Sequence, residues 1–472
     1  MSGPGSTVDP AVVQRQVRDH LLLNFTDWSN YDDADVPVFV RGEGCEVIDV
    51  HGKRYIDGLS GLYCSNLGHD FGAEIGAASA AQMAELAFTS TWTVAHPRAA
   101  ELAERLASHA PEGLNRVFFT TGGAEANEAM WKLARQWHAA NGQPQRTKAI
   151  ARKTAYHGTS LAALSFSGIE VMAEPFLPMA LPVRHVSATN AYRHPAGDDP
   201  EAFTAALLAE MEQAIIEEGE DQVAIIIAEP VQNAGGCFTP PPGYWQGLRA
   251  LCDKYGILLA SDEVICAFGR IGEWYGANAY GYTPDFIIFA KGATAAHAPL
   301  GGVLMHDRVA APFVSGDAYY MHGTTYSGHP VSCAIGLAVM DVYEREKVFE
   351  NVRENGPAFG QMLQELRSVD LVGDVRGTGY FWALELVKDR ASRETFEGDE
   401  ADWLLRQTLT AQVFEAGLLC RLDDRGDPVI QLSPPLVADR ETLARIVAIL
   451  GDALTDASAK VAGGALDRLA SS

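Results

Sequence analysis

Short apolar runs alternate with stretches of helical spacing through the middle of this chain, between about residues 72 and 335. The runs 223–228 (VAIIIA), 257–260 (ILLA) and 286–290 (FIIFA) are continuously apolar and too short for typical helices. Such runs are typical of strands that are buried on both faces of a parallel sheet. Amphipathic stretches such as 201–217 separate them. The alternation predicts an α/β fold with a mostly parallel, doubly wound sheet and helices on both of its faces.

The two ends of the chain carry a different pattern. Residues 38–59 contain short strand-like runs around Gly-containing turns, which predicts a small antiparallel meander. After Pro330 we expect one long helix to about residue 354, a hairpin at 418–432 and a last helix near 440–454. Together these segments predict a small α+β domain built from both chain ends. The predicted division is an N-terminal segment and part of the small domain at 1–71, a large ligand-binding domain at 72–335 and a C-terminal small domain at 336–472.

Two charged side chains follow two of the predicted buried strands. Asp262 comes just after 257–260, and Lys291 comes directly after 286–290. Because the carboxyl ends of parallel strands face the ligand crevice, we expect both side chains in one pocket. A buried Asp–Lys ion pair is one interpretation of this arrangement. The other is a ligand with a cationic ring nitrogen for Asp262 and an electrophilic carbon for Lys291, which pyridoxal 5′-phosphate (PLP) supplies together with a phosphate.

A Gly-rich turn offers a place for that phosphate. The segment 118–137 reads as strand, turn and helix, with small residues at Gly122, Gly123 and Ala124. Backbone N–H groups at a helix N-terminus bind anions, although Glu125 near the helix start also fits a simple helix beginning. The segment is not a Walker A loop, because no GK[ST] follows.

Two further polar segments add candidate ligand contacts. Tyr156 follows another predicted strand end, where its ring could stack on a flat cofactor or pack in the core. Thr325, in the loop HGTTYSGHP at 322–330, could bind a phosphate oxygen or belong to an ordinary turn.

Composition narrows the classes of function. The chain has 36 Lys plus Arg against 61 Asp plus Glu, a formal net charge of −25, which disfavours binding to nucleic acid or anionic membranes. Its seven cysteines are scattered without CxxC spacing, which argues against a disulfide framework or a zinc site and favours a reducing, cytoplasmic location. The first residues lack the pattern of a signal peptide, and no apolar run is long enough to cross a bilayer.

Five motifs, taken together, resemble the class III aminotransferases, which are PLP enzymes of fold type I. They are Asp-Glu-Val…Phe-Gly-Arg at 262–270, Lys291 in AKG, and the segments GGAEANE, YHG and HGTTYSGHP. The resemblance runs from about residue 35 to 450 with the motifs in order. Within the family the chain looks most like the ω-amino acid and amine:pyruvate transaminases.

The resemblance implies a role for each matching residue around the cofactor ring. Lys291 would bond covalently to PLP, and Asp262 would keep the pyridine nitrogen protonated. Val264 would lie against one face of the ring and Tyr156 against the other. Glu229, in AEPVQ, matches a family carboxylate near the cofactor, and capping of a turn is the alternative.

The resemblance also implies how the phosphate is held. The backbone amides of Gly123 and Ala124 would bind it, with Thr325 reaching in from a second subunit, so that the protein would be a homodimer. Family members commonly have Ser where Ala124 stands, which removes one hydroxyl donor but leaves the amide. They usually have Tyr where His297 stands, which affects the shape of the pocket.

For function, the resemblance implies transfer of an amino group from an amine or ω-amino acid to a keto acid such as pyruvate, with ping-pong kinetics. Arg421 resembles the mobile arginine that binds a substrate carboxylate, with Arg425 as its local rival and a surface ion pair as the structural alternative. Tyr63 and Trp92 would line the substrate pocket, or pack in the core or a dimer interface. A PLP-dependent racemase or aminomutase on the same fold is the rival enzyme class. A PLP-free scaffold is the non-enzymatic alternative.

Overall fold

A seven-stranded sheet lies at the centre of the part of the chain that is described, residues 8–32 and 34–469 of a computed structural model. Its order is β4–β10–β9–β8–β7–β5–β6. Strand β10 runs antiparallel to both neighbours, and the other pairings are parallel. The strands are β4 (Leu114–Thr120), β5 (Lys148–Arg152), β6 (Val183–Val186), β7 (Val223–Ala228), β8 (Leu258–Asp262), β9 (Phe286–Phe289) and β10 (Gly301–His306). The predicted mostly parallel sheet is confirmed, with one reversed strand that the sequence pattern did not reveal.

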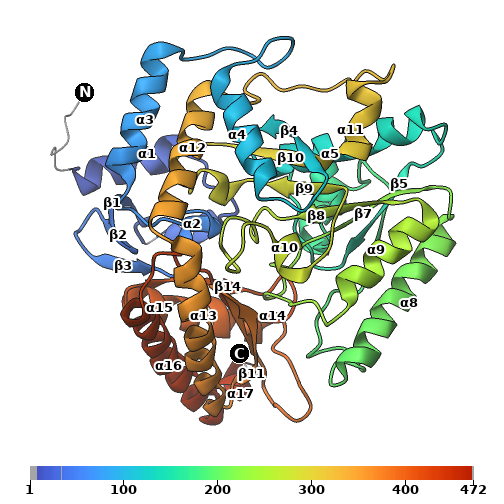
Figure 1. The fold of residues 1–472 in the computed structure, drawn as a ribbon. Helices are drawn as coiled ribbons and strands as arrows, with labels where there is room; N and C mark the ends of the chain where they lie inside the picture. Colours follow the sequence, from blue (N-terminus) through green and yellow to red (C-terminus); the bar gives the residue numbers. More distant parts are fainter. Residues whose placement is uncertain (1–7, 33, 470–472) are drawn as a thin grey trace.

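Helices pack on both faces of this sheet (Figure 1). They are α4 (Pro97–Ser108), α5 (Gly123–Ala140), α6 (Leu161–Phe166), α7 (Glu170–Ala173), α8 (Pro200–Glu218), α9 (Tyr244–Tyr255), α10 (Gly276–Tyr280) and α11 (Asp307–Val314). In β7, Ile225 and Ile227 belong to the cluster around α5, whereas Ile226 belongs to the cluster that includes α8 and α9. Successive side chains of a strand point to opposite faces, so a strand covered on both sides is apolar at every position. Each buried isoleucine contributes about 2 kcal/mol.

Two smaller four-stranded sheets are built from the ends of the chain, and the first of them joins the two ends. One contains β1 (Phe39–Glu43), β2 (Glu46–Asp49), β3 (Arg54–Asp57) and β13 (Leu418–Leu419); the other contains β11 (Val372–Thr378), β12 (Phe381–Leu386), β15 (Val429–Leu432) and β14 (Arg421–Asp423). Strand β13 pairs in parallel with β3, with Leu418 opposite Ile56. Figure 1 shows these N-terminal strands near the C-terminal helices α15 (Ala411–Glu415) and α16 (Arg440–Ala462). The α+β unit built from both chain ends is thus present, while the boundaries at residues 71 and 335 stay predictions.

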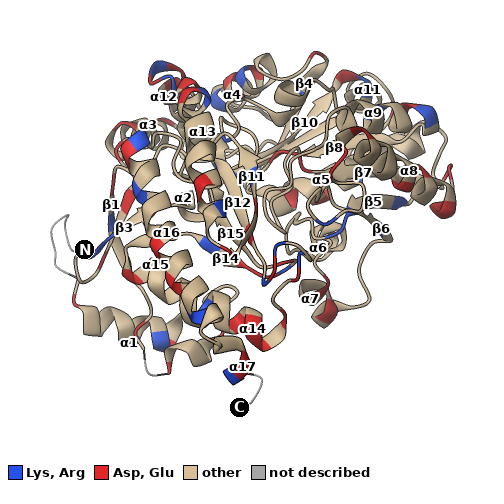
Figure 2. Ribbon diagram, turned by 90° about the horizontal axis from the view of Figure 1, so that it is seen from below, with Lys and Arg blue, Asp and Glu red and all other residues tan. Residues whose placement is uncertain are grey.

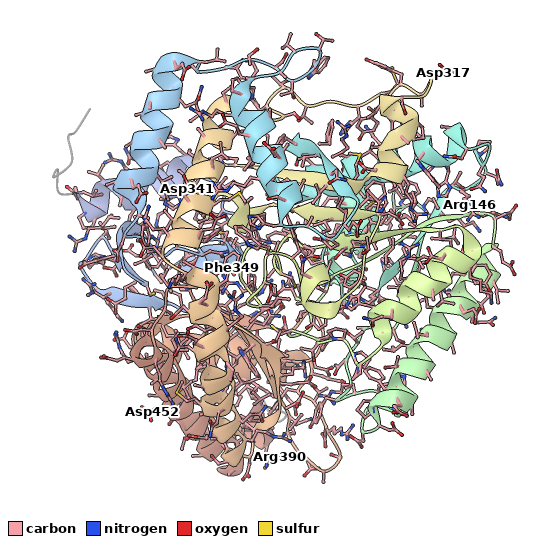
Figure 3. The ribbon with its side chains drawn as sticks, viewed as in Figure 1. Arg146, Asp317, Asp341, Phe349, Arg390 and Asp452 are labelled. Carbon is pink, nitrogen blue, oxygen red and sulfur yellow. The ribbon has the colours of Figure 1, made fainter. Side chains whose placement is uncertain are left out.

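The long helix expected from Pro330 to about residue 354 is wrong. The structure has two helices, α12 (Pro330–Arg345) and α13 (Val348–Glu365), separated by Lys347 in the left-handed region with φ +52°. The break turns Phe349 into the core, where its ring lies 4.7 Å from that of Trp274 (Figure 3). Packing of an aromatic side chain therefore outweighs the local preference to continue one helix.

The last predicted helix is present but longer than expected. It continues beyond residue 454 to Ala462, and Gly464, with φ +76°, separates it from α17 (Ala465–Leu469). Its added turns bury Ala457, a small residue that gives only a weak periodic signal. The remaining helices are α1 (Pro10–His20), α2 (Ser60–Tyr63), α3 (Gly72–Glu85) and α14 (Gly398–Asp402).

Charged side chains of both signs are spread over the outer helices, and the central strands carry few of them (Figure 2). Among the described residues no helix combines the length and apolarity needed to cross a membrane. The predicted absence of such a segment is confirmed to that extent.

Candidate active site

A cavity of about 420 Å³ lies at the carboxyl ends of the parallel strands. Its wall includes Asp262 and Lys291, from the neighbouring parallel strands β8 and β9. Tyr156, Val264 and Glu229 also line it, together with the first residues of α5. Asp262 and Lys291 therefore lie in one pocket, as expected from their positions at the strand ends. The Gly-rich turn and the ring of Tyr156 belong to the wall of the same pocket.

Lys291 stands at a sharp change of backbone direction. Its φ is +44°, in the left-handed region that non-glycine residues occupy at a cost of about 1 kcal/mol, and a single helical turn follows at Lys291–Ala293. Its Nζ lies 5.9 Å from the ring centre of Tyr63. Burial lowers the pKa of the Lys291 amine, because the charged form loses its hydration and the nearby carboxylates only partly replace it. The neutral amine is the form that can act as a nucleophile or accept a proton.

Asp262 is almost fully buried and well hydrogen-bonded. Its Oδ2 accepts hydrogen bonds from Nδ1 of His157 at 2.6 Å and Nδ2 of Asn127 at 3.1 Å. Its Oδ1 accepts one from the backbone N–H of Val264 at 3.1 Å. Burial alone favours the neutral acid, but the hydrogen bonds from His157 and Asn127 outweigh it and lower the pKa of Asp262. The carboxylate is therefore ionised at neutral pH.

These partners decide between two interpretations of the sequence. Among the described residues, the ion pair within 4 Å that involves Asp262 is with His157 and not with Lys291. The buried Asp262–Lys291 ion pair is therefore not formed. Sequence reasoning missed His157 and Asn127 as partners of Asp262, although both stand inside motifs that it had singled out, YHG and GGAEANE.

The Gly-rich turn forms the start of a long helix. Gly122 is extended, α5 begins at Gly123, and Glu125 accepts hydrogen bonds from both the backbone N–H and the hydroxyl of Thr121. A Cβ added at Gly123 would lie 3.0 Å from Cγ2 of Val264, so a larger residue would crowd the wall of the cavity. The helix start thus presents N–H groups to the cavity while Glu125 caps the turn behind it.

Glu229 combines the two roles considered for it. Its Oε2 accepts a hydrogen bond from the backbone N–H of Asn233 at 2.9 Å, which caps the turn after β7. Its Oε1 is buried without a hydrogen-bond partner among the described residues, and Glu229 lines the cavity. Burial raises the pKa of the Glu229 carboxyl.

Thr325 and Trp92 do not reach this cavity within one chain. Thr325 is exposed in the turn 325–328. Trp92 is 66% exposed, and its indole N–H donates to the backbone oxygen of Thr324 at 3.3 Å. Both lie outside the wall of the 420 Å³ cavity, and Trp92 lines a separate cavity of about 640 Å³.

The predicted substrate residues on the small-domain side lie close to one another. Tyr63 is buried, and its hydroxyl donates to Oε1 of Gln431 at 2.7 Å. Arg421 stands opposite Gln431 in the β14–β15 pairing, and its Nε lies 3.2 Å from Oδ2 of Asp423. Arg425 is held by the same carboxylate, through Nε to Oδ1 at 2.8 Å and Nη2 to Oδ2 at 2.5 Å. Neither arginine belongs to the lining of the 420 Å³ cavity, and neither does Tyr63. Arg425 is the arginine bound through two nitrogens to Asp423.

The residues of the cavity fit PLP. An ionised carboxylate for a pyridinium, an amine with a lowered pKa and an anion-binding helix start share one wall. Three buried polar atoms in that wall lack hydrogen-bond partners among the described residues, as expected of a site shaped for a polar ligand. They are Oδ1 of Asn127, Nε2 of His157 and Oε1 of Glu229.

Known proteins match the chain over nearly its whole length. A profile of the class III aminotransferases matches residues 30–454. A Mycobacterium tuberculosis protein named "Probable aminotransferase" is 47% identical over 424 residues, which cover 90% of this chain and 91% of the relative. The putrescine–pyruvate aminotransferase of Pseudomonas aeruginosa is 37% identical over 446 residues, covering 94% and 96%. An (S)-enantioselective ω-transaminase from Thermomicrobium roseum has a crystal structure with a TM-score of 0.91 at 40% identity, covering 96% of this chain and 100% of that one.

Proposed function

The chain belongs to the class III aminotransferase family, and we propose that within it the protein is an ω-transaminase. It would move an amino group from an amine or ω-amino acid to a keto acid such as pyruvate by a ping-pong mechanism. The observation that carries the proposal is the pairing of Lys291 and Asp262 at adjacent strand ends in one cavity, with Arg421 and Tyr63 close by. The names of the Pseudomonas and Thermomicrobium relatives support the substrate class.

The family uses PLP, which acts as an electron sink when the substrate Cα–H bond breaks. Asp262 would hold a proton on the pyridine nitrogen, because its ionised carboxylate is fixed by His157 and Asn127. Lys291 would hold the cofactor covalently until the substrate amine displaces it from that bond. Its freed, neutral amine would then take the proton from the substrate Cα and return it. Val264 and Tyr156 would keep the ring flat between them.

Arg421 would bind the substrate carboxylate. A guanidinium fork suits a carboxylate oxygen pair, and Arg421 lies near the cavity, where its charge helps to lower the pKa of Lys291. For an amine without a carboxylate, Arg421 would swing aside to make room for an apolar group. The Tyr63 ring next to Lys291 would then form the apolar wall of the substrate pocket.

The experiment that tests the function offers PLP-loaded protein four amino donors, with pyruvate as acceptor. The donors are both enantiomers of 1-phenylethylamine, β-alanine and 4-aminobutyrate, and the products measured are the carbonyl compound and alanine. Formation of both products supports the transaminase. An isomerised amine with no carbonyl product would instead indicate a racemase or aminomutase, and protein that never binds PLP would indicate a scaffold.

Replacing Arg421 by methionine should raise the KM for pyruvate by roughly 10²-fold, since a charge-assisted, two-pronged hydrogen bond is lost. The kcat/KM for 1-phenylethylamine should change by less than about threefold, because this donor has no carboxylate to bind. Steady-state kinetics with each substrate varied separately measures both effects. Arg406→Met is the matched control, because Arg406 pairs with Asp424 on the surface of the same segment. An unchanged KM for pyruvate in the Arg421 variant would refute the assignment of Arg421 to the substrate carboxylate.

We propose in addition that the protein is a homodimer in which Thr325 completes the partner's phosphate site. Thr325 is exposed and cannot serve the cavity of its own chain in this arrangement. Large apolar side chains are exposed nearby, a pattern that marks contact surfaces. They include Phe88, Trp92, Tyr319, Met321 and Tyr326.

Thr325→Val should weaken PLP binding about tenfold, as expected for one lost hydrogen bond to a charged group. Titration followed by cofactor absorbance gives the Kd, and light scattering gives the mass. Thr455→Val, on the exposed face of α16, is the control and should change neither quantity. A monomer with full activity would contradict the dimer.

A further inference from the structure

A cluster of one carboxylate and two guanidinium groups lies in the hairpin that joins β14 to β15. Asp423 is 5% exposed and contacts both Arg421 and Arg425. The neighbouring charges are engaged elsewhere, since Asp424 pairs with Arg406. In this cluster two cations share one anion, and Arg421 also interacts with the Tyr63 hydroxyl.

The two arginines share Asp423 unequally. Arg425 contacts both carboxylate oxygens, with Nε 2.8 Å from Oδ1 and 3.1 Å from Oδ2, and Nη2 2.5 Å from Oδ2, and its backbone N–H also donates to Oδ1 at 3.1 Å. The closest approach of Arg421 to this carboxylate is 3.2 Å, from Nε to Oδ2. Arg425 is thus the fixed partner of Asp423, and Arg421 is the loosely held one.

The hairpin that carries the cluster is packed firmly against the large domain. A Cβ at Gly426 would lie 3.3 Å from Cγ2 of Thr154, and Nη1 of Arg425 lies 3.9 Å from the sulfur of Met172. On the next strand, the Gln431 side chain donates to the backbone oxygen of Asn233 at 2.6 Å. A movement of Arg421 therefore has to occur in its side chain, because the backbone beneath it is held on both strands.

Removing one partner from a buried ion pair is costly, because the other charge is left buried and unpaired. If Arg421 were the sole partner of Asp423, every departure of Arg421 would leave such a carboxylate. With Arg425 bound to both oxygens, Asp423 keeps its counter-ion while Arg421 moves. We propose that Asp423 and Arg425 are positioning residues that set how readily Arg421 leaves the pocket, and so how well the enzyme accepts amines without a carboxylate. The inference rests on the proposed function of Arg421.

The test uses PLP-loaded enzyme with 1-phenylethylamine and pyruvate, because the amine requires Arg421 to move and the keto acid requires it to bind. In Arg425→Met, Asp423 has Arg421 as its remaining partner. The kcat/KM for the amine should fall by about tenfold or more, equivalent to about 1.4 kcal/mol, while that for pyruvate changes by less than about threefold. Arg425→Lys should recover part of the loss, since a single ammonium can pair with Asp423 but cannot bind both oxygens as a fork.

The double variant Arg425→Met/Asp423→Asn separates this role from a structural one. Removing the carboxylate releases Arg421, so the kcat/KM for the amine should return to within about threefold of the wild-type value. A variant that was merely poorly folded would lose both kcat/KM values together and would not be rescued by a second substitution. Asp424→Asn, which breaks only the neighbouring surface pair, should leave the ratio of the two values unchanged.

Three results with the variants would overturn the inference. The first is an Arg425→Met variant in which the ratio of the kcat/KM for the amine to that for pyruvate is unchanged. The second is an equal fall of both kcat/KM values in that variant. The third is a double variant whose kcat/KM for the amine is no higher than that of Arg425→Met. Wild-type enzyme that converts β-alanine with pyruvate but not 1-phenylethylamine would also overturn it, because Arg421 would then not move aside, and the transaminase function would still stand. Wild-type enzyme that converts neither donor would refute the proposed function itself.

Discussion

Replacing Lys291 by alanine should lower the turnover of 1-phenylethylamine with pyruvate by at least about 10⁴-fold, because both the covalent attachment and the proton carrier are lost. The fall should appear in kcat, since the amine acts in the chemical steps. The cavity and the helix start remain, so PLP should still bind without a covalent bond. Steady-state assays of acetophenone release, with dialysis to measure bound PLP, check both statements. Turnover close to that of the wild type would refute the assignment of Lys291.

A second substitution of Lys291 tests its effect on stability separately from its role in the reaction. The folded-state pKa of Lys291 is lowered from 10.5, so the unfolded chain binds the extra proton between the two values. The contribution of Lys291 to the free energy of unfolding of the cofactor-free protein therefore becomes more favourable as the pH rises between the two pKa values. It is least favourable below both of them. Lys291→Met fills the same space without a charge and should raise the Tm of the cofactor-free protein at pH 7, with a smaller gain near pH 10. A lower Tm at pH 7 would show that burial of Lys291 is not costly.

Replacing Asp262 by asparagine should lower kcat by roughly 10³-fold, in the range seen when one preorganised electrostatic partner is removed. Asparagine keeps a similar shape and one acceptor oxygen, but it cannot stabilise a protonated ring nitrogen. Its side chain would also present an N–H₂ group to a donor that now points at a carboxylate oxygen, either to the backbone N–H of Val264 or to His157 and Asn127. Rates of the first half-reaction, followed by stopped-flow absorbance of the bound cofactor, give the effect without the acceptor step.

Asp285→Asn provides a matched control for that variant. Asp285 is 1% exposed, lies just before β9 and pairs with Arg249 and Arg308, away from the cavity. Its substitution should lower the Tm while kcat stays within about threefold, because it breaks a buried pair that has no part in the chemistry. If the two Asp variants lost kcat equally, the special role of Asp262 would be refuted.

Much of this architecture follows from local pattern. The run VAIIIA at 223–228 coincides with β7, because a strand covered on both faces must be apolar at every position. Strand ends at one edge of a parallel sheet face one crevice, so Asp262 and Lys291 could be placed in a single cavity before any contact was known. Both inferences depend only on periodicity and on the short chain segments around each residue.

Other features were decided by contacts between segments that are distant in sequence. The hydrogen bond from His157 that keeps Asp262 ionised links two strand ends, and no spacing along the chain encodes it. The break at Lys347 arises because Phe349 packs on Trp274, although the local sequence favours a continuous helix. The local sequence shows the hydrophobic period of a helix or strand and how far it is buried. Which residues it then contacts depends on how all the elements pack together.

Arg421 and Arg425 also show which features follow from the local sequence and which depend on tertiary packing. Their sequence, RLDDRGD, places two arginines and an adjacent pair of aspartates in one hairpin and leaves either arginine free to bind a substrate. The tertiary structure distinguishes them, because Arg425 hydrogen-bonds to both oxygens of Asp423, whereas Arg421 approaches the carboxylate no closer than 3.2 Å. The sequence by itself determined the fold, the family and the two groups at the strand ends. The tertiary structure decided which charges neutralise each other, since a buried charge takes the partner that three-dimensional packing brings within hydrogen-bonding distance.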